Sequence, residues 1–338
     1  MILLSVNLNI AESENLDALS TRCASSIGQT TEVKPDLIVD CDPGHDDAIA
    51  ICVGANRANL IGVTTVAGNV SLEHTTNNAL AVVQMLGLDI EVHSGAAGPL
   101  NGDAGRFASF VHGENGLIGA TLPEVTRQVA STDAVSYILS ATIENPGAWI
   151  VAIGPLTNIA TALQREPALI DRISGISIMG GGTYGNISAA AEFNIHFDPE
   201  AAEIVFNSGA RIIQCGLDVT HQLLVTDALV DATAQIGNGF GRFSNGLLAG
   251  YLENIRLLTG ESLEAVLYDP CAVLAITDPE LFEFADRYVS VETRGEQTRG
   301  MTLVDQRSWM RGGPVKWAET IDAARATEVV LAAITAAP

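Results

Sequence analysis

Lysine is almost absent from this 338-residue chain, and basic residues as a whole are scarce. Lys34 and Lys316 are the only lysines, and 17 basic residues stand against 40 acidic ones, which gives a formal net charge of −23. The basic residues form no block anywhere along the chain. Because nucleic acids and anionic membranes attract clustered positive charge, the sequence argues against both as partners.

Long hydrophobic runs and paired cysteines are missing as well. No apolar run reaches the roughly 20 residues that a membrane-spanning helix needs. The opening MILLSVNLNIAESENLD lacks the basic start and the small-residue cleavage site of a signal peptide. The cysteines are odd in number and scattered, which indicates free thiols in a reducing compartment. We therefore expect a cytoplasmic protein. The five cysteines are Cys23, Cys41, Cys52, Cys215 and Cys271.

From Asp36 onward the chain alternates short β-branched runs with helical patterns. Runs such as LIVD and WIVAIG precede helical patterns such as DDAIAICVGAN and LTNIATALQ. This alternation predicts an α/β fold with an open, mostly parallel (mixed) central sheet, helices on both faces and a Rossmann-like core. A hairpin joined through Gly295 and a helix over residues 317–333 should end the chain. We expect a single domain over residues 35–338, preceded by a polar N-terminal arm over residues 1–34.

The densest polar motif is VDCDPGHDDAIA at residues 39–50. Asp40, Asp42, Asp46 and Asp47 fall within eight residues at a predicted strand-to-helix turn. Carboxylates this close repel one another unless a cation lies among them, and hard oxygen ligands favour calcium or magnesium over zinc. The Pro-Gly pair after Asp42 should turn the chain so that Asp42 and Asp47 reach one cavity. Alternatively, Asp46 and Asp47 only cap the helix, but capping gives no reason for carboxylates at the strand end.

This motif resembles the N-terminal signature of the inosine-uridine nucleoside hydrolases, and the resemblance continues in order along the chain. The further matching segments are TTVAGN at 64–69, HGENG at 112–116, GPLTNIA at 154–160, IMGGG at 178–182, AEFNIHFDPEAA at 191–202, GLDVTH at 216–221 and DPCAV at 269–273. Such an ordered set is highly specific. It implies the nucleoside-hydrolase type of α/β fold and hydrolysis of the N-glycosidic bond of ribonucleosides to free base and ribose, with a role in nucleoside salvage. Because the family usually forms oligomers, a homodimer or homotetramer is expected.

The resemblance also implies roles for single residues. One calcium ion per subunit is expected to be bound by the carboxylates of Asp42, Asp47 and Asp269 and by the backbone carbonyl of Ile153, with Asp40 supporting the site from close by. Asp42 is expected to act as the general base toward a calcium-activated water. A carboxylate-rich cavity also suits glycoside hydrolysis, because positive charge develops at the anomeric carbon. The residues expected to contact the ribose are Asp46, Asn69, Met179, Asn186, Glu192 and Asn194.

The side of the site that would meet the base departs from the family pattern. Better-known members have a histidine before the calcium aspartate, whereas this chain has Tyr268. A phenol could donate a proton, although its ordinary pKa near ~10 makes it a poorer acid than imidazolium; it could also stack on the base, or only pack. His112 is a second candidate catalytic group, with a surface-loop histidine as the alternative. We expect His45 to neighbour the site without a role and His221 to pack or cap.

Two other functions fit parts of the sequence. A DxD pair after a hydrophobic strand also suits a magnesium-dependent phosphohydrolase, but phosphate recognition needs cations and the chain has two lysines. A non-catalytic ribose-binding homologue would keep the cavity without turnover. The retained Asp42 argues against such a binder, whereas Tyr268 in place of histidine leaves it open. The sequence does not indicate whether the base would be a purine or a pyrimidine.

Overall fold

Strand β1 (Asp36–Cys41) lies inside a parallel sheet and leads directly into the acidic motif. We describe a computed structural model that covers residues 34–102, 107–260, 264–307, 309 and 315–338. Within it, Lys34–Pro338 forms one compact unit. The N-terminal arm expected over residues 1–34 lies, apart from Lys34, outside the described residues.

The described residues form a nine-stranded sheet in the order β3-β2-β1-β4-β5-β6-β9-β7-β8. Neighbouring strands from β3 to β9 in this order pair in parallel, whereas β7 pairs antiparallel with both β9 and β8. The predicted mixed, mostly parallel sheet is therefore confirmed. The remaining strands are β2 (Asn59–Thr65), β3 (Glu91–Ser94), β4 (Trp149–Ala152), β5 (Gly175–Met179), β6 (Ile212–Cys215), β7 (Phe282–Val291), β8 (Thr302–Asp305) and β9 (Val315–Ile321).

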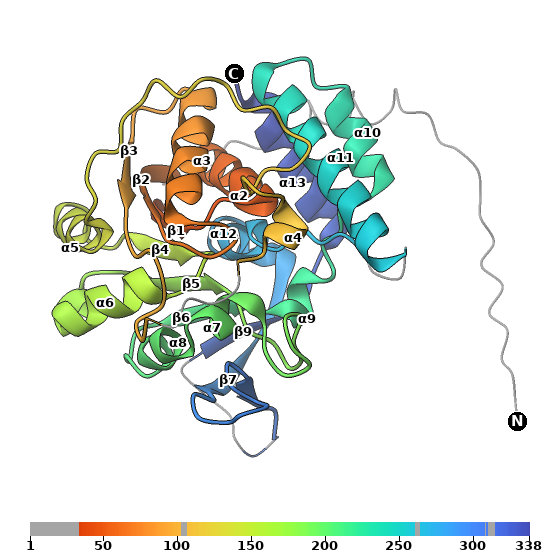
Figure 1. Cartoon of the computed structure of the whole chain (residues 1–338). Helices are drawn as coiled ribbons and strands as arrows, with labels where there is room; N and C mark the ends of the chain where they lie inside the picture. The colour runs from red at the N-terminus through yellow and green to blue at the C-terminus, as the bar shows by residue number, and fades with distance from the viewer. Residues whose placement is uncertain (1–33, 103–106, 261–263, 308, 310–314) are drawn as a thin grey trace, which may run out of the picture. The chain divides into compact units, whose positions relative to one another are not determined.

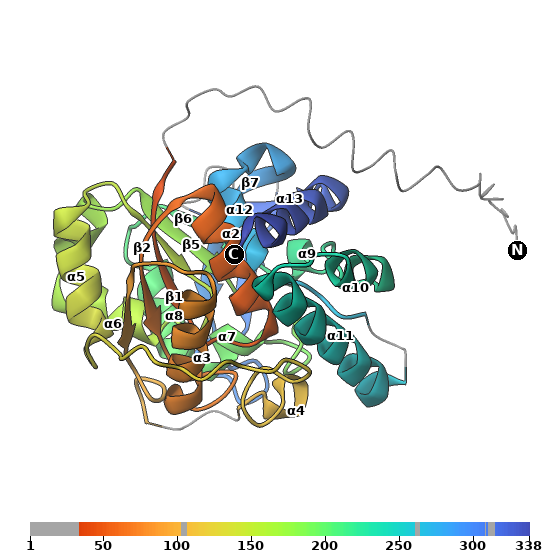
Figure 2. The ribbon, with the colours of Figure 1, turned by 90° about the horizontal axis from the view of Figure 1, so that it is seen from above.

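Helices cover both faces of the sheet, as the alternating pattern predicts (Figures 1 and 2). Side chains alternate between the faces, so Leu37 and Val39 belong to one buried cluster and Ile38 to the other. Helices α5, α6 and α8 pack on the Ile38 face, and α2, α3, α11, α12 and α13 pack on the opposite one. The helices are α2 (His45–Arg57), α3 (Leu72–Met85), α4 (Ser109–His112), α5 (Ala134–Glu144), α6 (Thr157–Arg165), α7 (Phe193–Phe197), α8 (Pro199–Phe206), α9 (Leu217–Thr220), α10 (Asp227–Ala234), α11 (Gly239–Thr259), α12 (Pro270–Thr277) and α13 (Ala323–Ala336), with the 3-10 helices η1 (Pro167–Asp171) and η2 (Pro279–Leu281).

The C-terminal part of the chain confirms one expectation and corrects another. Strands β7 and β8 form the predicted hairpin, with Tyr288 paired to Asp305 and Val291 to Thr302. The helix predicted over residues 317–333 is wrong at its start, because residues 315–321 form β9 between β6 and β7. Helix α13 begins after Asp322, whose side chain accepts a hydrogen bond from the backbone N–H of Arg325 at 3.2 Å.

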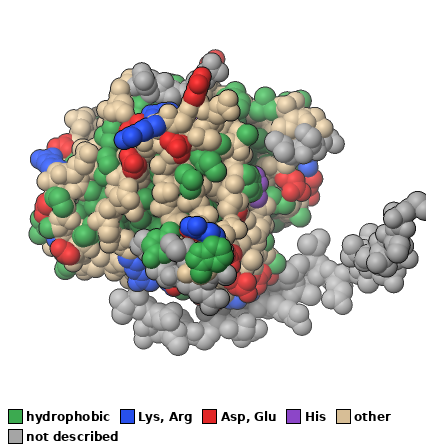
Figure 3. All heavy atoms as spheres, turned by 90° about the horizontal axis from the view of Figure 1, so that it is seen from below, with side chains coloured by type: hydrophobic (Ala, Val, Ile, Leu, Met, Phe, Trp, Pro, Cys, Tyr) green, Lys and Arg blue, Asp and Glu red, His purple; other side chains and the backbone are tan. Residues whose placement is uncertain are grey.

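The surface and the thiols agree with the composition. On the face shown in Figure 3, Lys and Arg side chains lie singly or in small groups near Asp and Glu side chains. Several arginines form ion pairs, such as Arg299 with Glu200 at 2.6 Å. In the part of the chain that the structure describes, no helix combines the length and apolar character needed to cross a membrane. Of the five cysteines, Cys23 lies outside the described residues, and the other four are buried free thiols.

Candidate active site

The polar segments that follow the parallel strands meet at one edge of the sheet. Asp42 follows β1, Asn69 follows β2, Ile153 follows β4 and Met179 ends β5. Ligand sites of open parallel sheets form at this edge because the loops after the strands and the helix N-termini converge there. The strand order therefore brings together residues more than 100 positions apart in the sequence.

The turn after β1 is held by Asp47, the third residue of α2. Its Oδ2 accepts a hydrogen bond from the backbone N–H of Gly44 at 2.8 Å, and its Oδ1 accepts one from the N–H of Asp42 at 3.1 Å. Asp47 thus caps the start of α2 by accepting the backbone N–H of the N-cap residue Gly44, which is one half of a capping box. This cap fixes the turn, so the neighbouring carboxylates are held in place by the backbone.

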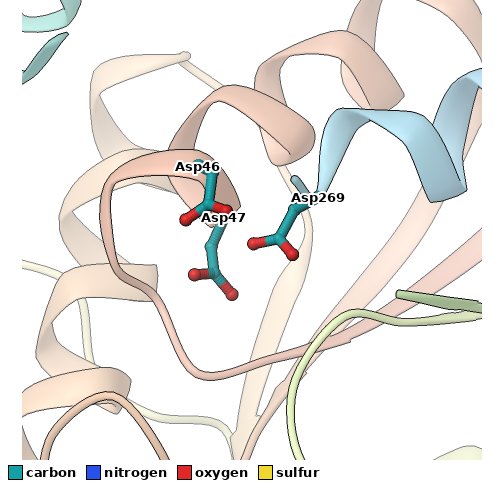
Figure 4. A group of neighbouring side chains, drawn as sticks. All are labelled: Asp46, Asp47 and Asp269. Atoms are coloured by element: carbon teal, nitrogen blue, oxygen red, sulfur yellow. The ribbon is translucent and has the colours of Figure 1, made fainter. Parts of the chain in front are cut away.

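Three buried carboxylates converge beyond this turn. One carboxylate oxygen each from Asp46, Asp47 and Asp269 lies within 4.8 Å of the other two, and Figure 4 shows Asp269 reaching from the start of α12 toward the two residues of α2. Burial raises the pKa of Asp46 to about 7 and that of Asp47 to about 6. Burial, and then the charges of Asp46 and Asp47, raise the pKa of Asp269 well above its ordinary value. This cluster could hold a metal ion, whose positive charge would offset the repulsion.

Asp42 lies beside this cluster in a narrow slot and is not one of its three members. Its Oδ2 accepts the backbone N–H of Asn69 at 2.6 Å, whereas its buried Oδ1 has no hydrogen-bond partner among the described residues. Glycines line the slot: a Cβ on Gly154 would lie 2.6 Å from Oδ1, and one on Gly68 would lie 2.1 Å from Oδ2. Burial, followed by the charge of Asp47, raises the pKa of Asp42 well above its ordinary value.

Asp40 supports this region from inside the fold. Its Oδ1 accepts hydrogen bonds from Thr64 Oγ1 at 2.5 Å and from Asn158 Nδ2 at 2.8 Å. These bonds join β1 to β2 and to α6. Its carboxylate is fully buried, and burial raises its pKa to about 7.

A cavity of about 410 Å³ opens over the cluster. The six predicted ribose contacts all line it, as do the four predicted residues Ile153, Asp269, His112 and Tyr268. Asp40, Asp42 and Asp47 are not among its lining residues and lie in the buried layer behind it. The six predicted ribose contacts are Asp46, Asn69, Met179, Asn186, Glu192 and Asn194.

Glu192 and Asn194 lie at the start of α7. Glu192 is the N-cap of this helix: its Oε1 accepts the N–H of Asn194 at 3.0 Å and its Oε2 accepts the N–H of Ile195 at 3.1 Å. Asn194 in turn donates from Nδ2 to the carbonyl of Ile153 at 2.9 Å and to that of Met179 at 3.2 Å. The three elements β4, β5 and α7 are therefore tied together where the cavity begins.

Tyr268 is half-buried and lines the cavity. The side chain of Asn186 lies close to the hydroxyl of Tyr268, and burial raises the pKa of Tyr268 above its ordinary value. The ring packs edge-on against His221, with ring centroids 5.7 Å apart, and His221 packs edge-on against Tyr184 in the same way. His221 therefore packs, as predicted.

Two histidines and a tyrosine stack on one another, and two of the three, His112 and Tyr251, line the cavity. The Nδ1 atoms of His45 and His112 lie 2.9 Å apart, and the ring of Tyr251 stacks on His45 with centroids 4.6 Å apart. Burial lowers the pKa of His112 to about 4, and it lowers the pKa of His45 well below its ordinary value. His45 is thus a direct neighbour of the site, and the half-buried His112 lines the cavity.

Helix α11 supplies cavity residues that the sequence interpretation missed. Tyr251, Ile255, Leu258 and Thr259 line the cavity, together with Phe110 from α4. The four α11 residues follow one another at intervals of four, three and one positions, which places them on one face of the helix. That periodicity was available in the sequence, but it gives no indication that the face meets a cavity, because buried packing produces the same spacing.

Comparisons with known proteins show which family the chain is similar to. The sequence profile of the inosine-uridine preferring nucleoside hydrolases matches residues 37–328. The pyrimidine-specific ribonucleoside hydrolase RihA of Enterobacter sp. (strain 638) is 43% identical over 277 residues, which cover 80% of this chain and 88% of that protein. RihA of Escherichia coli (strain SMS-3-5 / SECEC) is 42% identical over 274 residues, with the same coverage.

Solved structures give the same answer. A purine-preferring ribonucleoside hydrolase from Gardnerella vaginalis superposes with a TM-score of 0.83 at 32% identity, covering 89% of this chain and 98% of that one. A plant nucleoside hydrolase superposes with a TM-score of 0.82 at 35% identity, covering 90% and 99%. The chain belongs to the inosine-uridine preferring nucleoside hydrolase family. It is a nucleoside hydrolase enzyme, as the resemblance implies.

Proposed function

We propose that this protein hydrolyses the N-glycosidic bond of ribonucleosides with a bound calcium ion, and that Asp42 is the general base. One observation carries the proposal: buried carboxylates from α2 and α12 converge within 4.8 Å, and two of them, Asp46 and Asp269, also line the cavity. Buried, mutually repelling carboxylates are costly to a fold unless a cation or a proton neutralises them.

The donor atoms fit a hard divalent cation. Asp47 and Asp269 would bind it through carboxylate oxygens, and the unpartnered Oδ1 of Asp42 offers a third. The carbonyl of Ile153 accepts one bond from Asn194, and its second lone pair could serve the cation. All of these donors are oxygens, which favours calcium or magnesium. When bound, calcium would orient the ribose hydroxyls and lower the pKa of the attacking water.

Asp42 would accept the proton of that water. The bond from Asn69 to Oδ2 fixes the orientation of the carboxylate, which would take the proton at an oxygen that the cation does not occupy. Asp46, Asn69, Asn186, Glu192 and Asn194 would hold the ribose hydroxyls, and Met179 would lie beneath the sugar ring. The carboxylates also stabilise the positive charge that develops at the anomeric carbon.

His112 is our candidate for contact with the leaving base. The Nδ1 of His112 is engaged by His45. The Nε2 of His112 is therefore the nitrogen that a substrate could reach. Tyr268 is a weaker candidate acid, because burial raises the pKa of its hydroxyl. We therefore assign Tyr268 a packing role against the nucleoside.

We propose pyrimidine ribonucleosides as the preferred substrates. The relatives that are 41–43% identical to this chain are named pyrimidine-specific, whereas the purine-preferring enzyme from Gardnerella vaginalis is 32% identical. The cavity of about 410 Å³ lies within the usual range for small-molecule sites. A homodimer or homotetramer in the cytoplasm remains our prediction, which light scattering and cell fractionation would test.

The test is a set of ribose-release assays. Purified protein would be incubated with uridine, cytidine, inosine and adenosine, with and without a calcium chelator. We expect ribose release to be faster from uridine and cytidine than from inosine and adenosine, and to be lost when the chelator is added. For Asp42→Asn we expect a roughly 10²–10⁴-fold lower kcat. Asp36→Asn, at the other end of β1 where the side chain contacts Asn59 at 2.6 Å, is the matched control and should retain activity.

Two outcomes would support other functions. Phosphate release from a nucleotide without ribose release from any nucleoside would favour the phosphohydrolase. Tight ribose binding without turnover, in protein loaded with calcium, would favour the non-catalytic homologue. Either result would overturn the proposed function.

A further inference from the structure

The segment that carries His112 has little that holds it in place by itself. Helix α4 (Ser109–His112) is one turn long, contains no buried residue and has no side-chain cap at its N-terminus. A helix this short is not stable on its own. Its position in the cavity wall must therefore come from its contacts with other elements.

Asn254 on α11 supplies one such contact. Its Nδ2 donates hydrogen bonds to the carbonyl of Val111 at 2.7 Å and to that of Phe110 at 3.2 Å. Both acceptors are backbone carbonyls next to His112. The contact therefore fixes the path of the main chain at α4, whatever side chains Phe110 and Val111 carry.

The other side of the segment contacts the acidic turn. Asn78 on α3 donates from Nδ2 to the carbonyl of Pro43 at 2.9 Å and to that of Asn115 at 2.7 Å. The His112 ring lies against Gly44, where an added Cβ would be 2.5 Å from Nδ1. The segment is thus held between the turn that carries the aspartates and the helix that lines the apolar end of the cavity.

We propose that Asn254 is a positioning residue, which sets the place of His112 relative to the leaving base through the carbonyls of Phe110 and Val111. This inference rests on the proposed function. Asn254 itself is not among the cavity-lining residues, so it acts through another group. Small displacements of a catalytic group reduce rate strongly, because its contribution depends on orientation.

The experiment compares Asn254 with a matched residue on the same helix. Asn254→Ala removes the donor, and Asn254→Asp keeps the shape but faces two carbonyls with oxygens that cannot donate. Asn245 on α11 also donates from Nδ2 to two acceptors, the carbonyl of Val230 at 2.8 Å and Thr233 Oγ1 at 3.2 Å, but these lie on α10. Asn245→Ala and Asn245→Asp therefore control for the loss of a half-buried amide from α11.

Two substrates separate positioning from general damage. Uridine needs help at its leaving base, whereas a nitrophenyl riboside releases a stable phenolate without protonation. For the two Asn254 variants we expect kcat/KM for uridine to fall about 10- to 100-fold and that for the nitrophenyl riboside to fall less than about 3-fold. The Asn245 variants should leave the ratio between the two substrates unchanged. In a His112→Ala background, Asn254→Ala should cause little further loss on uridine.

The outcomes separate this inference from the proposed function. If the unmodified protein cleaves no ribonucleoside, the proposed function fails. If it cleaves uridine but Asn254→Ala and Asn254→Asp match it, or lose both substrates equally, the positioning role alone is overturned. Thermal unfolding of each variant shows which proteins are folded. If Asn254→Ala is not folded, Asn254→Asp is used for the comparison instead.

Discussion

His45 and His112 meet through their Nδ1 atoms at 2.9 Å, although 67 residues separate them in the sequence. One of the two Nδ1 atoms must carry a hydrogen and the other must accept it, so the pair sets the tautomers of both rings. Burial lowers the pKa of each ring, so both are neutral at pH 7. This contact joins the acidic turn to the segment that carries His112.

Removing one ring nitrogen from this pair should destabilise the protein. In His45→Phe the aromatic stack on Tyr251 can persist, but the Nδ1 of His112 is left buried without its partner. The expected cost is about 1–3 kcal/mol in the free energy of unfolding, measured by urea denaturation. Because His45→Phe/His112→Phe removes both partners, its cost should be smaller than the sum of the two single variants. Additive costs would show that the contact contributes nothing.

Calcium should stabilise the protein more at high pH than at low pH. Asp40, Asp46 and Asp47 have pKa values of about 7, 7 and 6 in the folded chain, above the ordinary value of about 3.9 in an unfolded chain. Without a cation the folded state therefore binds protons that the unfolded state has released between about pH 4 and pH 7, and its stability falls as pH rises through this window. A cation competes with these protons for the carboxylates.

The measurement is the shift of the melting temperature on addition of calcium. At pH 8, with calcium at about 100 times its dissociation constant, we expect a rise of about 5 °C, and at pH 5 a much smaller one. At each pH, His45 and His112 contribute equally to stability with and without calcium, so they cancel in the calcium-dependent shift. Asp269→Asn should abolish the shift. A shift equal at both pH values, or one produced by the same ionic strength of potassium chloride, would contradict a carboxylate site.

The sequence predicts the parallel sheet well because each strand appears as a compact β-branched run beside a helical pattern. It fails at β9, whose residues VKWAETI alternate only loosely, and whose strand conformation depends on pairing with β6 and β7. The acidic motif is visible as a local cluster. Which carboxylates converge is decided by packing: Asp46 joins Asp47 and Asp269, whereas Asp42 turns into a slot between two glycines. Asn254 carries no sequence signal, because its partners are backbone carbonyls.

Tyr268→Phe decides whether the phenol acts as an acid. Burial raises the pKa of the Tyr268 hydroxyl, so proton donation at neutral pH is unfavourable. We expect kcat of Tyr268→Phe for uridine to stay within about 5-fold of that of the unmodified enzyme. Loss of a general acid would lower kcat by more than this. The basic limb of the pH profile should also stay in place. A loss above about 100-fold, spared on the nitrophenyl riboside, would instead identify Tyr268 as the proton donor.

The slot around Asp42 can be tested through its glycines. A Cβ on Gly154 would lie 2.6 Å from Asp42 Oδ1, closer than any non-bonded carbon can approach an oxygen without a shift. Gly154→Ala should therefore move the carboxylate or the β4 loop and lower kcat by more than about 10-fold. Gly98→Ala is the matched control, because an added Cβ there meets nothing within 4 Å.

Measuring both kcat and the calcium-dependent shift of the melting temperature in Gly154→Ala shows what the slot does. If it only orients the base, Gly154→Ala should lower kcat while the calcium-dependent shift of the melting temperature persists, because Asp47 and Asp269 are untouched. If Asp42 is also a calcium ligand, as the family resemblance implies, the shift should shrink as well. Full activity in Gly154→Ala, with Gly98→Ala equally active, would mean that the position of Oδ1 does not matter and that Asp42 is not the base.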